Sequence, residues 1–391
     1  MLTGPRATGK TTTAARHARS IARLDREAER SAFEADPDGA LAAYSEPVLI
    51  DEWHLAPGVL GAVKRAVDSG SGGGRFLITG STRGKLESET WPGTGRIVDL
   101  RMEGLTRREL SGALNGPTFL DRLSGDISDG FSTLSSPPGL VDYVDMALRG
   151  GFPEIETGLS EIAAKAWLGG YVDQLLTRDI DLLDERRDPE KMRRYFEALC
   201  LNTTGVPDHS TLYEAAGIDA HTAKAYDRLL ENLFISRPIP AWSSNRLRRL
   251  VKSAKQLIVD PALAGSALSL SRADVMRDGN MIGRLIETFA IGQIRAEAEA
   301  LGSRFRLHHL RDKGGAHEID LIAEVPGGDL IAIEIKATSA PSRSDARHIR
   351  WLREQAGSRV IAGCVLHTGP IPLELDEAIY ALPLYSLWTQ S

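Results

Sequence analysis

Short apolar runs alternate with amphipathic stretches over the first hundred residues of the chain. Residues 47–52 are Pro-Val-Leu-Ile-Asp-Glu, and residues 75–81 form a second apolar run that ends in small hydroxyl side chains. Such runs are typical of buried parallel strands, whose carboxyl ends open into a ligand crevice. The apolar spacing at 57–68 predicts a helix between them, and a further strand is expected at 97–101. The pattern predicts an α/β domain with a parallel sheet over residues 1–110.

The middle of the chain changes to helical spacing. Residues 111–149 are rich in Ser, Gly, Asp and Pro, which predicts a linker or a poorly ordered insert. Over residues 150–265 we expect helices at 167–183, 192–200, 211–216 and 221–234. The break at 217–219 resembles the turn of a helix-turn-helix, and strand-like pieces follow at 234–236 and 256–260. This order predicts a helical and winged-helix region.

The last part of the chain, residues 280–391, has the pattern of a mixed α/β domain. We expect helices at 282–301 and 344–357, and strands at 305–310, 317–323, 330–336 and 360–366. Glu334 and Lys336 are two residues apart in a strand, so they share one face of the sheet. Helix, three strands, helix and strand, with the order D…E-x-K, is the pattern of the PD-(D/E)xK restriction-endonuclease-like fold.

The composition sets broad limits on function. A chain of 391 residues is expected to form about two to three domains, and 42% hydrophobic with 26% charged residues is typical of soluble globular proteins. There is no apolar run of membrane length, and Cys200 and Cys364 form no metal-ligand spacing. We therefore expect a cytoplasmic protein with no membrane partner. A net charge of −6 argues against a polycationic surface for nucleic acid.

The most specific motif lies at the start of the chain, where residues 4–11 fit G-x-x-x-x-G-K-[ST] without a mismatch. In such a loop the backbone N–H groups and the following helix bind a phosphate chain, the lysine reaches the β- and γ-phosphates, and the hydroxyl ligates Mg²⁺. The alternative is a chance glycine-rich turn before a helix. We predict ATP and Mg²⁺ as cofactors. The expected nucleotide-binding residues, the last two as γ-phosphate sensors, are Gly4, Pro5, Arg6, Ala7, Thr8, Gly9, Lys10, Thr11, Thr12, Thr79 and Ser81.

Two acids end the first apolar run. Asp51 is expected to hold Mg²⁺ together with Thr11, and Glu52 to activate the attacking water beside the catalytic Lys10. Two solvated acids at a strand end are the alternative. Arg96 fits either an arginine finger that reaches a neighbouring subunit or a salt-bridged surface arginine.

Several segments together resemble a known family. They are Leu2-Thr3-Gly4-Pro5-Arg6, Ile50-Asp51-Glu52, Leu77-Ile78-Thr79-Gly80-Ser81, Gly95-Arg96 and Leu105-Thr106-x-x-Glu109. Over essentially its whole length the chain is similar to the AAA-type ATP-binding proteins of bacteria and archaea that carry a C-terminal domain of unknown function, number 4143. The resemblance implies an additional-strand P-loop core with the P-loop strand at the centre of the sheet, and a restriction-endonuclease-like C-terminal domain. Only three residues precede the loop, so either the true start lies upstream or this strand is a stub.

The C-terminal pattern supplies a second candidate site. Asp320 and Glu334 would ligate Mg²⁺, with Glu287 as an additional acid from the helix. Glu334 and Lys336 would be catalytic, the lysine by positioning water beside a phosphodiester. The alternative is that charged and apolar residues alternate on any half-exposed strand, and many proteins of this fold are not nucleases.

Five basic residues precede this domain with no acid among them: Arg246, Arg248, Arg249, Lys252 and Lys255. A winged helix could place such a wing on DNA phosphates. The alternative is an exposed basic loop on a rigid connector.

Two functions are open at this point. The first is an AAA-type ATPase whose nucleotide state controls a nuclease-like, DNA-binding C-terminal half. The second is a nucleotide-dependent switch or scaffold with a catalytically inactive C-terminal domain. A small-molecule kinase is less favoured, because the Asp-Glu pair suits water as the acceptor. The expected partners are ATP, DNA or a protein, and a second copy of the chain through nucleotide-dependent self-association.

Overall fold

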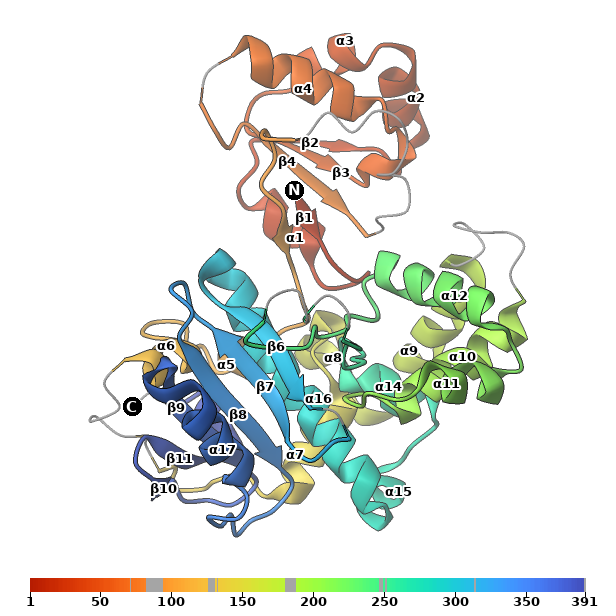
Figure 1. Ribbon diagram of the computed structural model, residues 1–391. Helices are drawn as coiled ribbons and strands as arrows, with labels where there is room; N and C mark the ends of the chain where they lie inside the picture. The colour runs from red at the N-terminus through yellow and green to blue at the C-terminus, as the bar shows by residue number, and fades with distance from the viewer. Residues whose placement is uncertain are drawn as a thin grey trace. The chain divides into compact units, whose positions relative to one another are not determined.

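Five parallel strands, in the order β2-β3-β4-β1-β5, form the sheet of the first hundred residues (Figure 1). They are β1 (Leu2–Thr3), β2 (Ser20–Arg23), β3 (Val48–Asp51), β4 (Phe76–Gly80) and β5 (Leu100–Arg101). β4 lies between β3 and β1, so the additional strand that the resemblance implies is present. The expected central position of the P-loop strand is corrected, because β1 lies between β4 and β5 and the middle strand is β4.

The helices of this part begin with α1 (Lys10–Ala15), α2 (Glu27–Ala35), α3 (Pro37–Ala42) and α4 (Val59–Ser69). All four residues of β3 are buried. The side of α4 that carries Val59, Leu60, Ala62 and Val63 packs into the same hydrophobic core. The amphipathic spacing of α4 and the continuous apolar run of β3 thus produce the expected layers, a buried strand covered by a helix.

The computed structural model divides into two compact units. One contains Met1–Glu103 and Arg228–Ile235, and the other contains Gly104–Asp227 and Ser236–Ser391. The structure describes residues 1–70, 72–81, 94–125, 131, 133–179, 188–245, 249, 252–312 and 314–389. In the described part of the chain no helix is long and apolar enough to cross a membrane.

The range 111–149, expected to be a linker, is partly helical. It contains α6 (Phe119–Ser124) and α7 (Leu140–Arg149), and α5 (Arg107–Leu110) precedes it. The Thr118 hydroxyl caps α6, and Phe119 is fully buried. The linker prediction is therefore wrong for α6 and α7. A six-residue helix has too few turns for its apolar periodicity to stand out in sequence, although its packing against a long helix stabilises it.

Helices dominate the next part, as expected. They are α8 (Pro153–Gly158), α9 (Glu161–Gln174), α10 (Pro189–Leu201), α11 (His209–Ala216), α12 (Ala220–Asn232), α14 (Pro261–Ala267) and α15 (Arg272–Arg277). Gly217, in the left-handed conformation with φ 64°, ends α11. The two strand-like pieces are shorter than expected, and the antiparallel bridges Ser236–Ile258 and Ile239–Lys255 join the segments that contain them.

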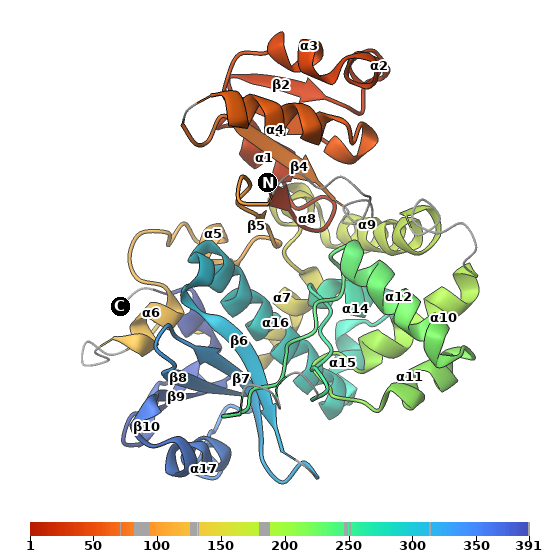
Figure 2. The same cartoon turned by 45° about the horizontal axis from the view of Figure 1, so that its top comes forward.

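A six-stranded mixed sheet, in the order β10-β11-β9-β8-β7-β6, forms the C-terminal part. Its elements are α16 (Gly279–Ala300), β6 (Arg306–Arg311), β7 (Glu318–Glu324), β8 (Leu330–Lys336), α17 (Arg347–Ala356), β9 (Val360–His367), β10 (Leu373–Asp376) and β11 (Ile379–Pro383). Helix α16 packs on β8, and α17 on β7, β8 and β9 (Figure 2). The sequence predicted every element up to β9 and missed β10 and β11.

Candidate functional sites

The N-terminal loop has a backbone that only particular residues can adopt. Gly4 has φ 148° and Gly9 has φ 87°. A Cβ atom on Gly4 would lie 2.1 Å from the carbonyl oxygen of Met102, so the loop cannot keep this path with a larger residue. Ala7 also takes a positive φ of 60°, and the Thr8 hydroxyl donates to the Pro5 carbonyl at 2.9 Å. The loop is thus held in a tight curl directly before α1.

The Lys10 ammonium is enclosed by this loop. Its Nζ donates to the carbonyl oxygens of Gly4 at 3.0 Å and of Pro5 at 2.5 Å. Burial lowers the pKa of Lys10 to about 8, and the nearby Glu52 carboxylate opposes that shift. The Lys10 ammonium therefore lies inside the curl of the loop. Both of the hydrogen bonds given above for it are donated to neutral carbonyl groups. Such an arrangement suits an incoming anionic phosphate.

Asp51 joins three elements at the carboxyl end of the sheet. Its Oδ1 accepts the Thr11 hydroxyl at 2.7 Å and the Thr79 hydroxyl at 2.5 Å, and its Oδ2 lies 4.0 Å from a guanidinium nitrogen of Arg23. Thr11 is the second residue of α1, Asp51 ends β3 and Thr79 is in β4. A hydroxyl and a carboxylate are oxygen ligands that Mg²⁺ prefers. The donor set at this position therefore fits a magnesium ion.

Glu52 sits in a strained turn next to Asp51. Its φ of 55° is left-handed, which is costly for a residue with a side chain. Burial raises the pKa of Glu52, and the Lys10 ammonium opposes that rise. Its Oε2 lies 3.2 Å from Nδ1 of His54. His54 could not be recognised as a site residue from the sequence, because one histidine after two acids has no characteristic spacing.

The end of β4 supplies a further polar group. The Ser81 hydroxyl is buried and has no hydrogen-bond partner among the residues that the structure describes, so it is open to a ligand or water. Gly80 precedes it, and a Cβ there would lie 2.7 Å from Trp53 Nε1. A glycine at this point therefore lets the buried Trp53 pack beside the site. Thr12, in contrast, is exposed.

Arg96 does not join this group in the structure. Its guanidinium makes two contacts with the Asp68 carboxylate, at 2.5 and 3.2 Å, and both side chains are exposed. Of the two alternatives for Arg96, the structure thus shows the salt-bridged surface arginine. An arginine finger in a neighbouring subunit stays a prediction.

The acids of the C-terminal part do come together. Glu287 comes from α16, Asp320 from β7, and Glu334 and Lys336 from β8. Lys336 Nζ lies 2.8 Å from Glu334 Oε2 and 3.9 Å from Asp320 Oδ2. Glu287 is linked to Asp320 by a different cation, the ammonium of Lys255.

This cluster does not fit a divalent cation as it stands. A lysine ammonium already contacts two of the three carboxylates, and a second contacts the third. Within the described ranges, no group of three or more His, Cys, Asp or Glu side chains is arranged to hold a metal ion. The sequence missed the place of Lys255 in this cluster, because local pattern does not show which distant acids a basic residue will meet.

Comparisons with protein families agree with this division of the chain. A model described as AAA domain matches residues 1–111. Two models described as domains of unknown function, DUF8612 and DUF4143, match residues 140–274 and 282–387. The chain combines an AAA domain with a C-terminal DUF4143 domain. The DUF8612 match covers α7 to α15, including part of the range expected to be a linker.

Two curated mycobacterial proteins are similar to the chain along its whole length. The chain is similar to the uncharacterized protein Rv2008c of Mycobacterium tuberculosis and to the uncharacterized protein Mb2031c of Mycobacterium bovis. In each case it is 27% identical over 395 aligned residues, which cover 100% of this chain and 80% of the relative. No solved structure matches the chain significantly.

Three basic residues ahead of the DUF4143 domain make contacts within the chain itself. Arg246 and Arg248 lie outside the described residues. The Arg249 guanidinium donates to both oxygens of Glu324, at 2.8 and 3.1 Å, and Lys252 Nζ donates to the Arg311 carbonyl at 3.1 Å. With Lys255 fully buried, three residues of the expected wing serve internal contacts, and the expectation that they face DNA phosphates is corrected.

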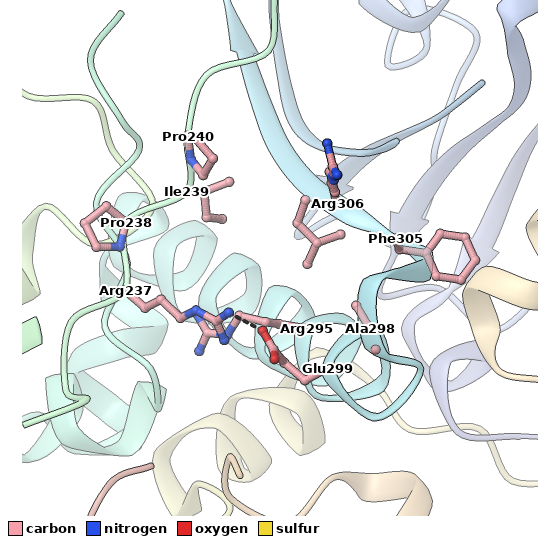
Figure 3. Close-up of a pocket in the computed structure, with 11 residues that line it drawn as sticks. Arg237, Pro238, Ile239, Pro240, Arg295, Ala298, Glu299, Phe305 and Arg306 are labelled. Carbon is pink, nitrogen blue, oxygen red and sulfur yellow. Dashed lines mark hydrogen bonds and ion pairs between the residues drawn. The ribbon is translucent and has the colours of Figure 1, made fainter. Parts of the chain in front are cut away.

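A pocket of about 270 Å³ lies between α16, the start of β6 and the segment after α12. Figure 3 shows Arg237 and Arg295 side by side on its floor, with Glu299 paired to Arg237. Arg306 also lines it. Three guanidinium groups and one carboxylate give this wall a positive excess, so an anionic group is the chemistry that it suits.

Proposed function

We propose that the AAA domain binds ATP with Mg²⁺ and hydrolyses it. The observation that carries this proposal is the meeting of Thr11 and Thr79 on one oxygen of Asp51, beside a loop that encloses the Lys10 ammonium. A phosphate-binding loop, a metal-ligand pair and a following acid in this arrangement are the parts that phosphoryl transfer to water requires.

Each residue then has a chemical role. Lys10 exchanges its two carbonyl contacts for phosphate oxygens, to which a charged donor binds more strongly than to neutral carbonyls. Thr11 and Asp51 would hold magnesium, which supplies charge neutralisation on the phosphates when it is bound. Glu52 orients the attacking water and accepts its proton. The Ser81 hydroxyl, which is open to a ligand, senses the γ-phosphate or the water.

The test compares two variants with matched controls. Glu52→Gln should retain ATP binding while the hydrolysis rate falls about 100-fold or more, because the water loses its base. Lys10→Ala should weaken ATP binding about 10-fold or more, since a charge-assisted contact is lost. The controls Glu27→Gln and Lys64→Ala make the same types of substitution at positions outside the site. Both should bind and hydrolyse ATP as the wild type does. A wild type that neither binds nor hydrolyses ATP would overturn the proposal.

We further propose that nucleotide state acts on the rest of the chain through residues 228–235. These residues belong to the same unit as the AAA sheet, and the Arg101 guanidinium of β5 lies 5.4 Å from the Phe234 ring centre. The chain runs directly from Ile235 into the segment that carries Lys255. Hydrogen exchange of residues 236–260 should therefore differ between ATP and ADP in Glu52→Gln. Equal exchange in both nucleotides would contradict this coupling.

One observation favours a DUF4143 domain that has no nuclease activity over a DUF4143 domain that is a nuclease. The Lys255 ammonium contacts two of the three carboxylates that would ligate the metal. The second hypothesis, a nucleotide-dependent switch with an inactive C-terminal domain, is therefore the better supported. The absence of Mg²⁺-dependent DNA nicking in the wild type, with and without ATP, would agree with it, and nicking that Lys336→Ala abolishes would contradict it.

A further inference from the structure

The acidic cluster of the DUF4143 domain contains its own cation. Lys255 is completely buried. Its Nζ lies 2.5 Å from Glu287 Oε1, 3.2 Å from Asp320 Oδ1 and 3.2 Å from the Asp320 carbonyl oxygen. An ammonium group has three hydrogens to donate, so these three contacts use its full capacity.

Other polar groups of the cluster are also engaged, although Glu334 Oε1 is buried and has no hydrogen-bond partner among the residues that the structure describes. The second oxygen of Asp320 accepts the Ile335 backbone N–H at 2.9 Å, and Glu334 pairs with Lys336. Burial raises the pKa of Glu334, with the neighbouring Asp320 carboxylate acting in the same direction. The carboxylates of Glu287 and Asp320 thus face the ammonium groups of Lys255 and Lys336, so two anionic side chains of the cluster are already paired with two cationic ones.

The backbone fixes Lys255 in this place. Its N–H donates to the Ile239 carbonyl at 2.9 Å, and the Ile239 N–H donates back to the Lys255 carbonyl at 2.8 Å. The next residue, Gln256, donates its N–H to the Gly205 carbonyl at 2.8 Å. The lysine therefore enters the cluster from a paired segment, so its position does not depend on the side chain alone.

We infer that the ammonium of Lys255 takes the place of the divalent cation in this cluster, so that the site fastens residues 252–260 to the DUF4143 sheet instead of cutting phosphodiesters. Mg²⁺ needs close to six oxygen ligands in octahedral order, and here the Lys255 ammonium occupies one carboxylate oxygen of Glu287 and one of Asp320. A doubly charged ion next to two ammonium groups would also meet strong repulsion at low dielectric. This inference does not depend on ATP hydrolysis by the AAA domain.

The experiment measures bound Mn²⁺ by electron paramagnetic resonance, on the full chain without nucleotide. The AAA domain is the same in every variant, so any ion held there cancels in the comparison. The wild type and Glu334→Gln should bind the same number of ions, because the cluster holds none. Lys255→Met should bind one ion more, and Lys255→Met combined with Glu334→Gln should lose it again.

Thermal unfolding gives the second readout. Lys255→Met should unfold about 5 °C lower or more, because it leaves buried carboxylates without their partner, and Mn²⁺ should recover part of that loss. Lys252→Met, in the same segment but outside the cluster, should show neither effect.

An ion in the wild type that Glu334→Gln removes would overturn the inference, and this comparison holds even where Lys255→Met fails to fold. A folded Lys255→Met that gains no ion would overturn it as well. Loss of ATP hydrolysis in any variant bears on the AAA domain and leaves both readouts unchanged.

Discussion

Thr11 and Asp51 lie 40 positions apart in sequence, and the Thr11 hydroxyl donates to Asp51 Oδ1 across 2.7 Å. The contact joins the first residues of α1 to the end of β3. Thr79 donates to the same oxygen from β4. A single carboxylate oxygen thus connects the helix after the loop with two neighbouring strands.

Thr11→Ala should lower the rate of Mg²⁺-dependent ATP hydrolysis about 10-fold or more, because it removes a metal ligand and one of the two hydroxyls on Asp51. The rate is measured as a function of Mg²⁺ concentration, and excess Mg²⁺ should recover part of the loss. Thr13→Ala is the matched control, since Thr13 is an exposed threonine of the same helix. Equal Mg²⁺ dependence in the two variants would contradict the assignment of Thr11.

Gly4→Ala should destabilise the AAA domain by about 2 kcal/mol or more and abolish nucleotide binding, because the new Cβ would collide with the Met102 carbonyl. Urea unfolding and fluorescent-nucleotide titration measure the two effects. Gly169→Ala provides the contrast. Gly169 lies within α9 with open space around its Cβ position, so the change should stabilise by about 0.5–1 kcal/mol. A loss of stability there would show that α9 needs the glycine.

Two arginines each form a paired contact with a carboxylate, but one pair is largely buried and the other is exposed. Arg249 and Glu324 are 15% and 10% exposed, whereas Arg65 and Asp38 are 58% and 54% exposed. Arg249→Ala should therefore cost about 2–4 kcal/mol of unfolding free energy, because Glu324 is left buried without its partner. Arg65→Ala should cost little or no unfolding free energy, since water replaces the arginine. Chemical denaturation measures both, and similar losses would contradict the dependence on burial.

The AAA domain could be predicted closely because its signals are local. The apolar run at 47–52 became β3 (Val48–Asp51), and its acidic end marked the crevice where parallel strands finish. The meeting of Asp51 with Thr79 follows from the same rule, since β3 and β4 are parallel neighbours. Strand order and the P-loop motif together were sufficient to bring these side chains to one edge.

Long-range partners could not be predicted in the same way. Lys255 meets Glu287 across 32 positions and Asp320 across 65, and Arg249 meets Glu324 across 75. A sequence shows that a stretch is positively charged. The same five charges could be exposed on a solvated loop, bind DNA phosphates or pair with buried carboxylates. Only the path of the backbone between residues 236 and 260 decides among them.

The histidine next to this segment is held neutral. His309 is 1% exposed, and its Nε2 lies 3.1 Å from the Ser253 carbonyl oxygen. Burial, together with the positive charges of Lys255, Lys252 and Arg311, lowers the pKa of His309 to about 4, while the Ser253 carbonyl acts in the opposite direction.

Stability should therefore fall as the pH drops from about 6.5 to about 4. In the unfolded chain His309 takes up a proton near pH 6.5, but in the folded chain only near 4, so acid favours the unfolded state in that range and has no effect above it. The loss should be on the order of 3 kcal/mol. Urea unfolding across this range should show a flatter pH dependence for His309→Gln, because glutamine does not titrate, whereas His221→Gln, at an exposed position, should leave it unchanged. If the wild type and His309→Gln lose stability equally, His309 is not the group that acid protonates on unfolding.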